Sequence, residues 1–218
     1  MPEPLIPSSF LFRYSVPCLY RKLDWSPRGL QLGDEHRLVS FAELDGRRSY
    51  AEVRAAWSER GLGFSVRVQG KRQPPWCRET QFDDSDGLHV WVDTRDTHNI
   101  HRAGRFCHRY GFLPSGGGGR REDPVAGQVL INRAREHPKP AAPHHLLVRS
   151  EKRIDGYLLE AMVLTGGLTG FDPAEHPRLG FTYAVFDREL GEQTFGVGSE
   201  FPYQEDPSVW GTLELVRE

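Results

Sequence analysis

Short runs of alternating apolar and polar residues recur along the chain, whereas apolar residues spaced by three and four, as in amphipathic helices, are rare. In the segment 88–93, Leu88, Val90 and Val92 alternate with polar or aromatic residues. Because successive side chains of a strand point to opposite faces, this period of two predicts a strand with one buried face. The pattern predicts about ten short strands, at 39–44, 51–57, 64–69, 88–93, 106–112, 128–132, 145–149, 157–164, 179–186 and 211–216.

Many short strands separated by turn residues are typical of a β-sandwich. Glycine (23 residues) and proline (16 residues) are both abundant, which favours turns over long helices. We therefore expect an all-β fold, a single jelly-roll-like antiparallel sandwich with a few short helical turns. The sandwich is expected to span 39–218, with residues 1–38 as an N-terminal extension packed on it. Four consecutive glycines at 116–119 predict a mobile loop.

Charge and cysteine content restrict the class of protein further. The 28 basic and 30 acidic residues nearly balance, and no Lys/Arg-rich run stands out, so nucleic-acid binding is not expected. The apolar runs fall far short of the ~20 residues that span a bilayer, so membrane insertion is not expected either. Early prolines interrupt any secretory signal, and three cysteines are too few for a disulfide framework. These features favour a cytoplasmic location.

Four motifs occur in a recognisable order along the chain. Asp-Gly-Leu-x-Val-x-Val-Asp at 86–93 is followed by Gly-Tyr-x-x-Glu-Ala at 156–161, Gly-Phe-x-Tyr-x-Val-x-Asp at 180–187 and Asp-Pro-Ser-x-Trp-Gly-x-Leu-x-Leu at 206–215. This order resembles the family 9 carbohydrate-binding modules and the broader DOMON-like sandwiches. The resemblance implies a jelly-roll-like sandwich that binds a saccharide on aromatic side chains. It also implies structural calcium in some members, and no catalysis.

Polar and aromatic residues are densest between positions 76 and 110. Sugars present apolar C–H faces ringed by hydroxyls, so a binding site needs an aromatic platform edged by planar hydrogen-bonding groups. In a strand, His89, Trp91, Asp93 and Arg95 would share one face. The carbohydrate-binding candidates are Trp76, Trp91, Asp93, Arg95, His98, Arg105 and His108. The alternative is that Trp91 packs under a loop and that Asp93 and Arg95 only fix the end of the strand.

A metal site is less well supported by the residue spacing. His98, His101, Cys107 and His108 are all zinc-ligand types, but their spacing is not that of a common finger. The adjacent Cys107 and His108 would also diverge on a strand, so no metal ligands are assigned. The aspartates at 83–86 offer oxygen ligands for calcium, although such acidic turns are usually only solvated. No other cofactor is expected.

Catalysis is also disfavoured by the residues present. Cys107 with His98 or His101 would be a nucleophile and base, but nothing in the sequence indicates an activated thiol. Glu160 is a single carboxylate on a strand, best explained as a buried glutamate paired with an arginine. We therefore expect a non-catalytic domain that binds a carbohydrate or a related polar small ligand. The alternative is an intracellular structural or interaction protein whose His/Arg-rich insertion binds a partner or a metal.

Overall fold

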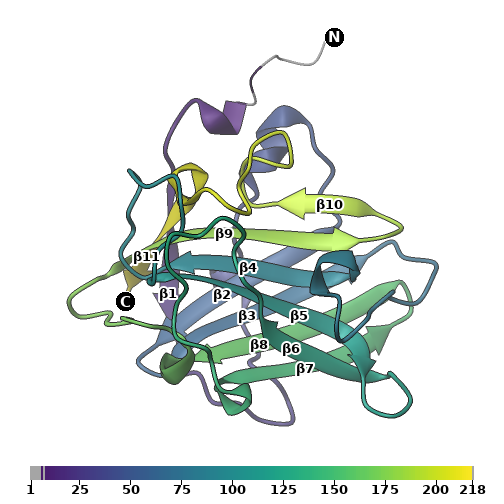
Figure 1. Ribbon diagram of the computed structural model, residues 1–218. Helices are drawn as coiled ribbons and strands as arrows, with labels where there is room; N and C mark the ends of the chain where they lie inside the picture. The colour runs from purple at the N-terminus through teal and green to yellow at the C-terminus, as the bar shows by residue number, and fades with distance from the viewer. Residues whose placement is uncertain (1–5, 7, 218) are drawn as a thin grey trace.

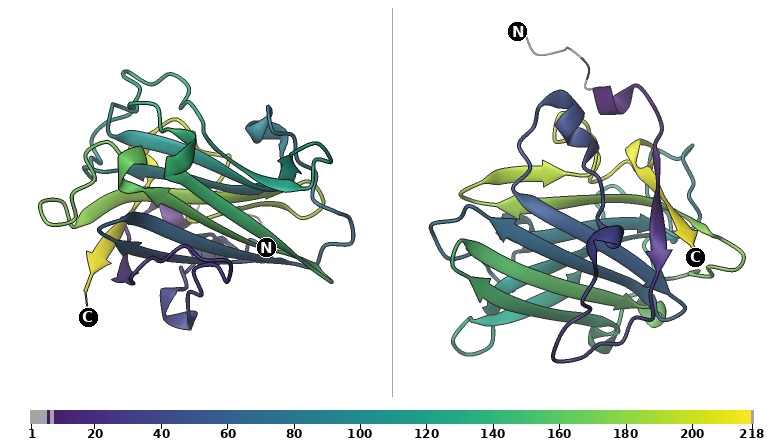
Figure 2. Two further views of the ribbon diagram at one scale, coloured as in Figure 1. Left: turned by 90° about the horizontal axis from the view of Figure 1, so that it is seen from below. Right: turned by 180° about the vertical axis from the view of Figure 1, so that it is seen from behind.

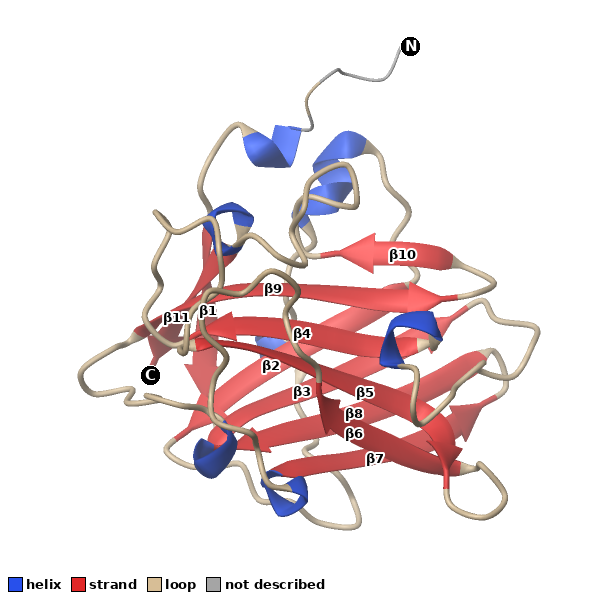
Figure 3. Ribbon diagram, viewed as in Figure 1, coloured by secondary structure: helices blue, strands red, loops and turns tan. Residues whose placement is uncertain are grey.

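The computed structural model describes residue 6 and residues 8–217. Eleven strands form one continuous sheet in this part of the chain, with short 3-10 turns at its rims (Figures 1 and 3). The strands are β1 (Ser15–Tyr20), β2 (Ala51–Ser58), β3 (Gly61–Gln69), β4 (Gly87–Asp93), β5 (Cys107–Gly117), β6 (Asp123–Gln128), β7 (Leu146–Arg153), β8 (Gly156–Leu164), β9 (Arg178–Asp187), β10 (Gly191–Thr194) and β11 (Gly211–Val216). The 3-10 turns are η1 (Ser8–Phe10), η2 (Asp34–His36), η3 (Phe41–Asp45), η4 (Phe82–Asp84), η5 (Pro143–His145), η6 (Thr165–Gly167) and η7 (Pro207–Val209).

The sheet folds over on itself into two layers. Its strand order is β6-β5-β4-β9-β11-β1-β2-β3-β8-β7, with β10 paired to the outside of β9. Figure 2 shows the layer that contains β4, β5 and β9 lying over the layer that contains β2, β3 and β8. Phe64 of β3 and Phe181 of β9 stack across the interface with ring centroids 6.0 Å apart. The predicted all-β sandwich is thereby confirmed.

The first strand changes the predicted boundary of the domain. β1 pairs in parallel with both β11 and β2, while the other strand pairs are antiparallel. Residues 15–20 therefore lie inside the sheet instead of packing on it as an extension, and the sandwich begins before residue 39. Residues 1–5 and 7 of the predicted extension lie outside the described residues.

Two predicted strands and one predicted loop have a different structure. The segment predicted as a strand at 39–44 forms η3, because the Phe41 N–H donates to the Phe195 carbonyl and the chain then turns away from the sheet. Of the strand predicted at 128–132, only Gln128 belongs to β6. The glycine run expected to form a mobile loop instead completes β5 and turns tightly into β6. Glycine permits this turn because Gly116 and Gly118 have φ of 109° and 71°.

Three apolar clusters stabilise the fold. The largest lies between the two layers and includes Leu88, Val90 and Val92 of β4, as the alternation predicts. A second covers the outer face of the β4–β5–β9 layer with loop residues such as Tyr203 and Trp210. A third covers the outer face of the other layer with residues 23–32, against Ala56 and Met162. Loops from distant parts of the chain thus bury much of both outer faces. No helix in the described ranges is long and apolar enough to cross a bilayer.

Candidate functional site

The outer face of β4 carries the predicted row of polar and aromatic residues, but loops cover it. Trp91 is fully buried, and its Nε1–H donates to the Gln204 carbonyl at 3.1 Å. The Tyr203 ring packs edge-on against the indole with centroids 5.4 Å apart. Of the two interpretations that the sequence allows for Trp91, the structure has the ring packed under a loop, where no ligand reaches it without rearrangement.

Asp93 and Arg95 shape the turn that follows β4. The Asp93 carboxylate accepts hydrogen bonds from the backbone N–H groups of Arg95 (3.0 Å) and Thr97 (2.7 Å). Burial raises the pKa of Asp93 in spite of these hydrogen bonds. The Arg95 guanidinium donates to the Gly170 carbonyl at 2.6 Å and lies 4.2 Å from the centroid of the Phe106 ring. Both side chains therefore fix local backbone.

The remaining candidates from the insertion between β4 and β5 do not meet in one place. His98 is within hydrogen-bond distance of Asp96 and Thr212, at 2.8 and 3.0 Å. Arg105 is exposed and lies over Phe106. His108 is fully buried on the inner side of β5, 3.0 Å from the Tyr110 hydroxyl, and burial lowers its pKa to about 4.

The catalytic and metal alternatives find little geometric support. Cys107 and His108 belong to opposite faces of β5, and burial raises the pKa of the Cys107 thiol to about 12, away from thiolate reactivity. Within the described ranges, no group of three or more His, Cys, Asp or Glu side chains is placed to hold a metal ion. Glu160 contacts the Arg149 guanidinium and accepts a hydrogen bond from the Leu30 N–H at 2.8 Å, which confirms its interpretation as a paired buried glutamate.

Trp76 differs from the other candidates because its indole is 41% exposed. It lies in the connection between β3 and β4, where Pro74 and Pro75 restrict the backbone before it. The Trp76 N–H donates to the Asp86 carboxylate at 3.0 Å, and the Asp86 N–H donates to the Trp76 carbonyl at 2.7 Å. The backbone of the tryptophan is therefore fixed while its ring remains open to solvent.

A buried ion cluster holds this arrangement in place. The Lys71 ammonium lies 3.0 Å from Asp86 and 2.5 Å from Asp187, and all three side chains are buried. Burial alone would lower the pKa of Lys71, but hydrogen bonds to Asp187 and Asp86 raise it above its ordinary value. The other Asp86 oxygen accepts the Arg188 N–H at 2.8 Å. Asp86 thus connects Trp76 to the turn after β9.

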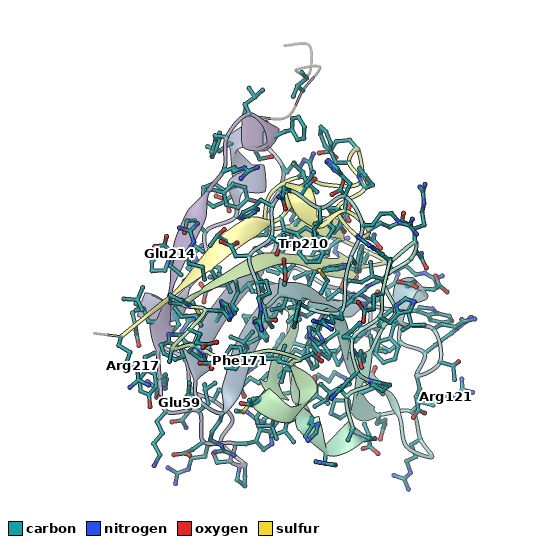
Figure 4. All side chains as sticks on the ribbon, turned by 60° about the vertical axis from the view of Figure 1, so that its left-hand side comes forward. Glu59, Arg121, Phe171, Trp210, Glu214 and Arg217 are labelled. Atoms are coloured by element: carbon teal, nitrogen blue, oxygen red, sulfur yellow. The ribbon has the colours of Figure 1, made fainter. Side chains whose placement is uncertain are left out.

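The β5–β6 hairpin forms the opposite side of a groove beside Trp76. A Cβ atom at Gly116 would lie 3.1 Å from the Cys77 Cβ, tighter than most such contacts, and the φ of 109° is one that favours glycine. Arg121 lies near the tip of the hairpin, at the right-hand edge of the molecule in Figure 4. The groove is open and encloses about 500 Å³, with a lining of Trp76, Cys77, Arg78, Glu79, Thr80, Gln81, Gly116, Gly118 and Arg121.

A second depression extends this groove along the surface. It encloses about 570 Å³ and shares Arg78, Thr80 and Gln81 with the first. Its far end contains Gln128 and the 63% exposed Leu130. The two depressions together place the aromatic side chains of Trp76 and Phe82 beside planar amide, carboxylate and guanidinium groups.

Sequence reasoning identified Trp76 but missed most of this surface. Gln81 and Arg78 are close to Trp76 in the sequence, and nothing in their local pattern separates them from ordinary turn residues. Arg188, whose guanidinium lies 4.5 Å from the Trp76 ring centroid, is contributed by the turn after β9. A juxtaposition of this kind depends on the β4–β9 pairing and leaves no signal in residue spacing.

The comparisons with known proteins bear on the fold. No family model matches the chain, and a search of curated proteins finds no match. Among solved structures, a family 9 carbohydrate-binding module from Caldicellulosiruptor kristjanssonii in complex with cellotriose superposes with a TM-score of 0.62. That match has 11% sequence identity and covers 94% of this chain and 95% of the other. It confirms the fold.

Further solved structures give the same picture. A family 9 module from the same organism in complex with glucose matches with a TM-score of 0.59 and 11% identity, over 94% of this chain and 97% of that one. A structure from Bacteroides uniformis matches with a TM-score of 0.56 and 13% identity, over 94% and 100% of the two chains. The resemblance to family 9 modules that the motifs indicate thus holds at the level of architecture, while the DOMON-like grouping stays a prediction.

Proposed function

We propose that this chain is a non-catalytic saccharide-binding domain and that its binding site is the groove beside Trp76. One observation carries the proposal: an indole that is 41% exposed borders an open groove, although its backbone is fixed by a buried carboxylate. A fixed platform loses little conformational entropy when it stacks on a ligand. The planar groups of Gln81 and Glu79 lie along the same groove, within reach of sugar hydroxyls.

The solved structures with this architecture support the proposal, because two of them contain a bound saccharide, cellotriose or glucose. The shape of the groove is a second support. It is open at the surface and continues into the depression that ends at Leu130, which suits an oligosaccharide better than a ligand that must be enclosed. A ligand can also enter this open groove without any change in the backbone of the two layers.

Tryptophan-fluorescence and calorimetric titrations with mono- and oligosaccharides test the proposal. We expect saturable binding that Trp76→Ala weakens by at least about fivefold, because stacking on an aromatic ring typically contributes about 1–3 kcal/mol. Trp25→Phe is the matched control, since Trp25 is a partly buried tryptophan packed on the cluster of residues 23–32 outside the other layer. Binding that survives Trp76→Ala unchanged would place the site elsewhere, and absence of any binding would refute the function.

A further inference from the structure

The positive charge around Trp76 is not neutralised by the protein. The Arg78 and Arg188 guanidiniums lie 5.0 and 4.5 Å from the centroid of the indole, and Arg121 lines the same groove. None of these three arginines has a carboxylate oxygen within 4.0 Å anywhere in the described ranges. The Arg78 guanidinium instead donates to the neutral amide of Gln81 at 2.8 Å.

Three arginines on the opposite layer differ from those around Trp76. Arg54, Arg67 and Arg149 also lie around a surface depression, and each of them contacts a carboxylate. Arg28 lines that depression too and, like Arg135 elsewhere in the described ranges, is in no ion pair, so the groove is distinguished by the gathering of three unpaired guanidiniums around one exposed indole. The groove itself contributes only Glu79 as a carboxylate, against Arg78 and Arg121 in its lining and Arg188 at the ring.

From this charge distribution we infer that the groove selects an acidic saccharide, one that carries a carboxylate or a sulfate on the sugar residue stacked on Trp76. This inference rests on the proposed saccharide function and names its ligand class. Guanidinium groups form paired, charge-assisted hydrogen bonds with carboxylate and sulfate oxygens. A sugar that stacks on the indole would displace the Arg78 and Arg188 guanidiniums from above the ring to its own edge, where they would meet such an anion.

A neutral sugar gains less from the same site. The guanidiniums near the ring are attracted to its π face, so a stacking ligand has to displace them. An acidic sugar gives the displaced guanidiniums a new partner, whereas a neutral sugar does not. The second depression is less positive, because Asp83 and Asp84 line it beside Arg78 and Asp83 is paired with Arg109. We therefore place the acidic residue at Trp76 and a neutral residue of the oligosaccharide toward Leu130.

The test compares cellotriose with two derivatives of the same backbone, one oxidised to carboxylates at C6 and one sulfated at C6. At low salt we expect the preferred charged derivative to bind on the order of tenfold more tightly than cellotriose, as charge-assisted hydrogen bonds predict. The two charged arms tell carboxylate from sulfate recognition. The preference should shrink at about 0.5 M salt, because exposed charges are then screened.

Variants assign the preference to the groove. The triple substitution Arg78→Gln, Arg121→Gln and Arg188→Gln should reduce the ratio of charged to neutral affinity to near one. Arg135→Gln is the matched control, because Arg135 is exposed and is also without a carboxylate partner in the described ranges. It lies away from the groove, where its backbone N–H donates to the Ala103 carbonyl in the connection between β4 and β5. Urea unfolding curves check that the variants remain folded.

Each outcome has a defined meaning. Tighter binding of a charged derivative that the triple substitution removes and Arg135→Gln retains supports the inference. Equal binding of charged and neutral sugars, or a preference that survives the triple substitution, overturns the inference while the saccharide function stands. If neither the charged nor the neutral sugars bind, the proposed function and the inference both fail.

Discussion

On acidification this protein should begin to lose stability at a higher pH than the one at which most carboxylates titrate. The reason is that two histidines are buried in neutral form. His89 is fully buried, and the Arg109 guanidinium donates a hydrogen bond to its Nδ1 at 2.9 Å. Burial and the charge of Arg109 lower the pKa of His89 to about 3, and burial lowers the pKa of His108 to about 4. An unfolded histidine has a pKa of about 6.5.

The sign of the effect follows from these values. Below pH 6.5 the unfolded chain binds protons at both positions while the folded chain does not, so acidification favours unfolding. The free energy of unfolding is therefore highest above about pH 6.5. It decreases as the pH falls, until His108 is protonated in the folded chain near pH 4 and His89 near pH 3. At pH 5, about 1.5 units below the pKa of an unfolded histidine, each buried histidine lowers the free energy of unfolding by about 2 kcal/mol. The pair together lowers it by about 4 kcal/mol. That is a large part of the ~5–15 kcal/mol that stabilises a typical domain.

Urea unfolding between pH 8 and pH 5 measures this loss, and NMR of the histidine Cε1–H resonances assigns it. The His89 and His108 resonances should not shift over this range, with the exposed His137 as an internal reference. His89→Gln keeps an acceptor for Arg109 and should reduce the proton uptake on unfolding by about one near pH 5. A loss of stability below 1 kcal/mol between pH 8 and pH 5, or a His89 resonance that titrates near pH 6, would refute the reasoning.

Two further perturbations test the construction of the groove. Gly116→Ala places a Cβ 3.1 Å from Cys77 at a φ of 109°, so we expect a loss of about 1–3 kcal/mol by urea unfolding and weaker saccharide binding. Gly119→Ala meets no atom within 4 Å and should change neither, so equal behaviour of the two variants would contradict a docked hairpin. Lys71→Met leaves the buried carboxylates of Asp86 and Asp187 without a cation and should cost about 3–5 kcal/mol. Adding Asp187→Asn should restore part of this, and a Lys71→Met loss under 1 kcal/mol would rule out the ion cluster as the support of Trp76.

The alternation of residues in the sequence was sufficient to predict most strands and the inner face of β4. It was not sufficient for β1, because Pro17 interrupts the strand pattern and argues against a central strand. In the structure β1 pairs with β2 only at Leu19 and Tyr20, so Pro17 requires no partner on that side. A strand such as β1 forms because neighbouring strands of the complete sheet supply its backbone hydrogen-bond partners, and the local sequence does not reveal those partners.

The sequence likewise predicted one part of the candidate site and not the rest. A period of two correctly places Trp91 on the outer face of β4, but it carries no information on whether a distant loop covers that face. Tyr203 and Gln204 cover it, from a segment more than one hundred positions later in the chain. Trp76 was found from its residue type, while Gly116 and Arg188 reach it only through tertiary pairing.

The position of β1 between β11 and β2 has a consequence for how the domain is made. β1 precedes the other strands in the chain, yet its longest ladder is with β11, which follows them all. At translation rates of about 5–20 residues per second, β1 waits on the order of ten to forty seconds for that partner. During this interval β11 has not been made, so the edges of β1 and β9 that pair with it stay open, and such edges pair readily with other chains. Closure of the sheet therefore waits for the synthesis of its last strand, and the chain that still lacks β11 is the form most exposed to aggregation.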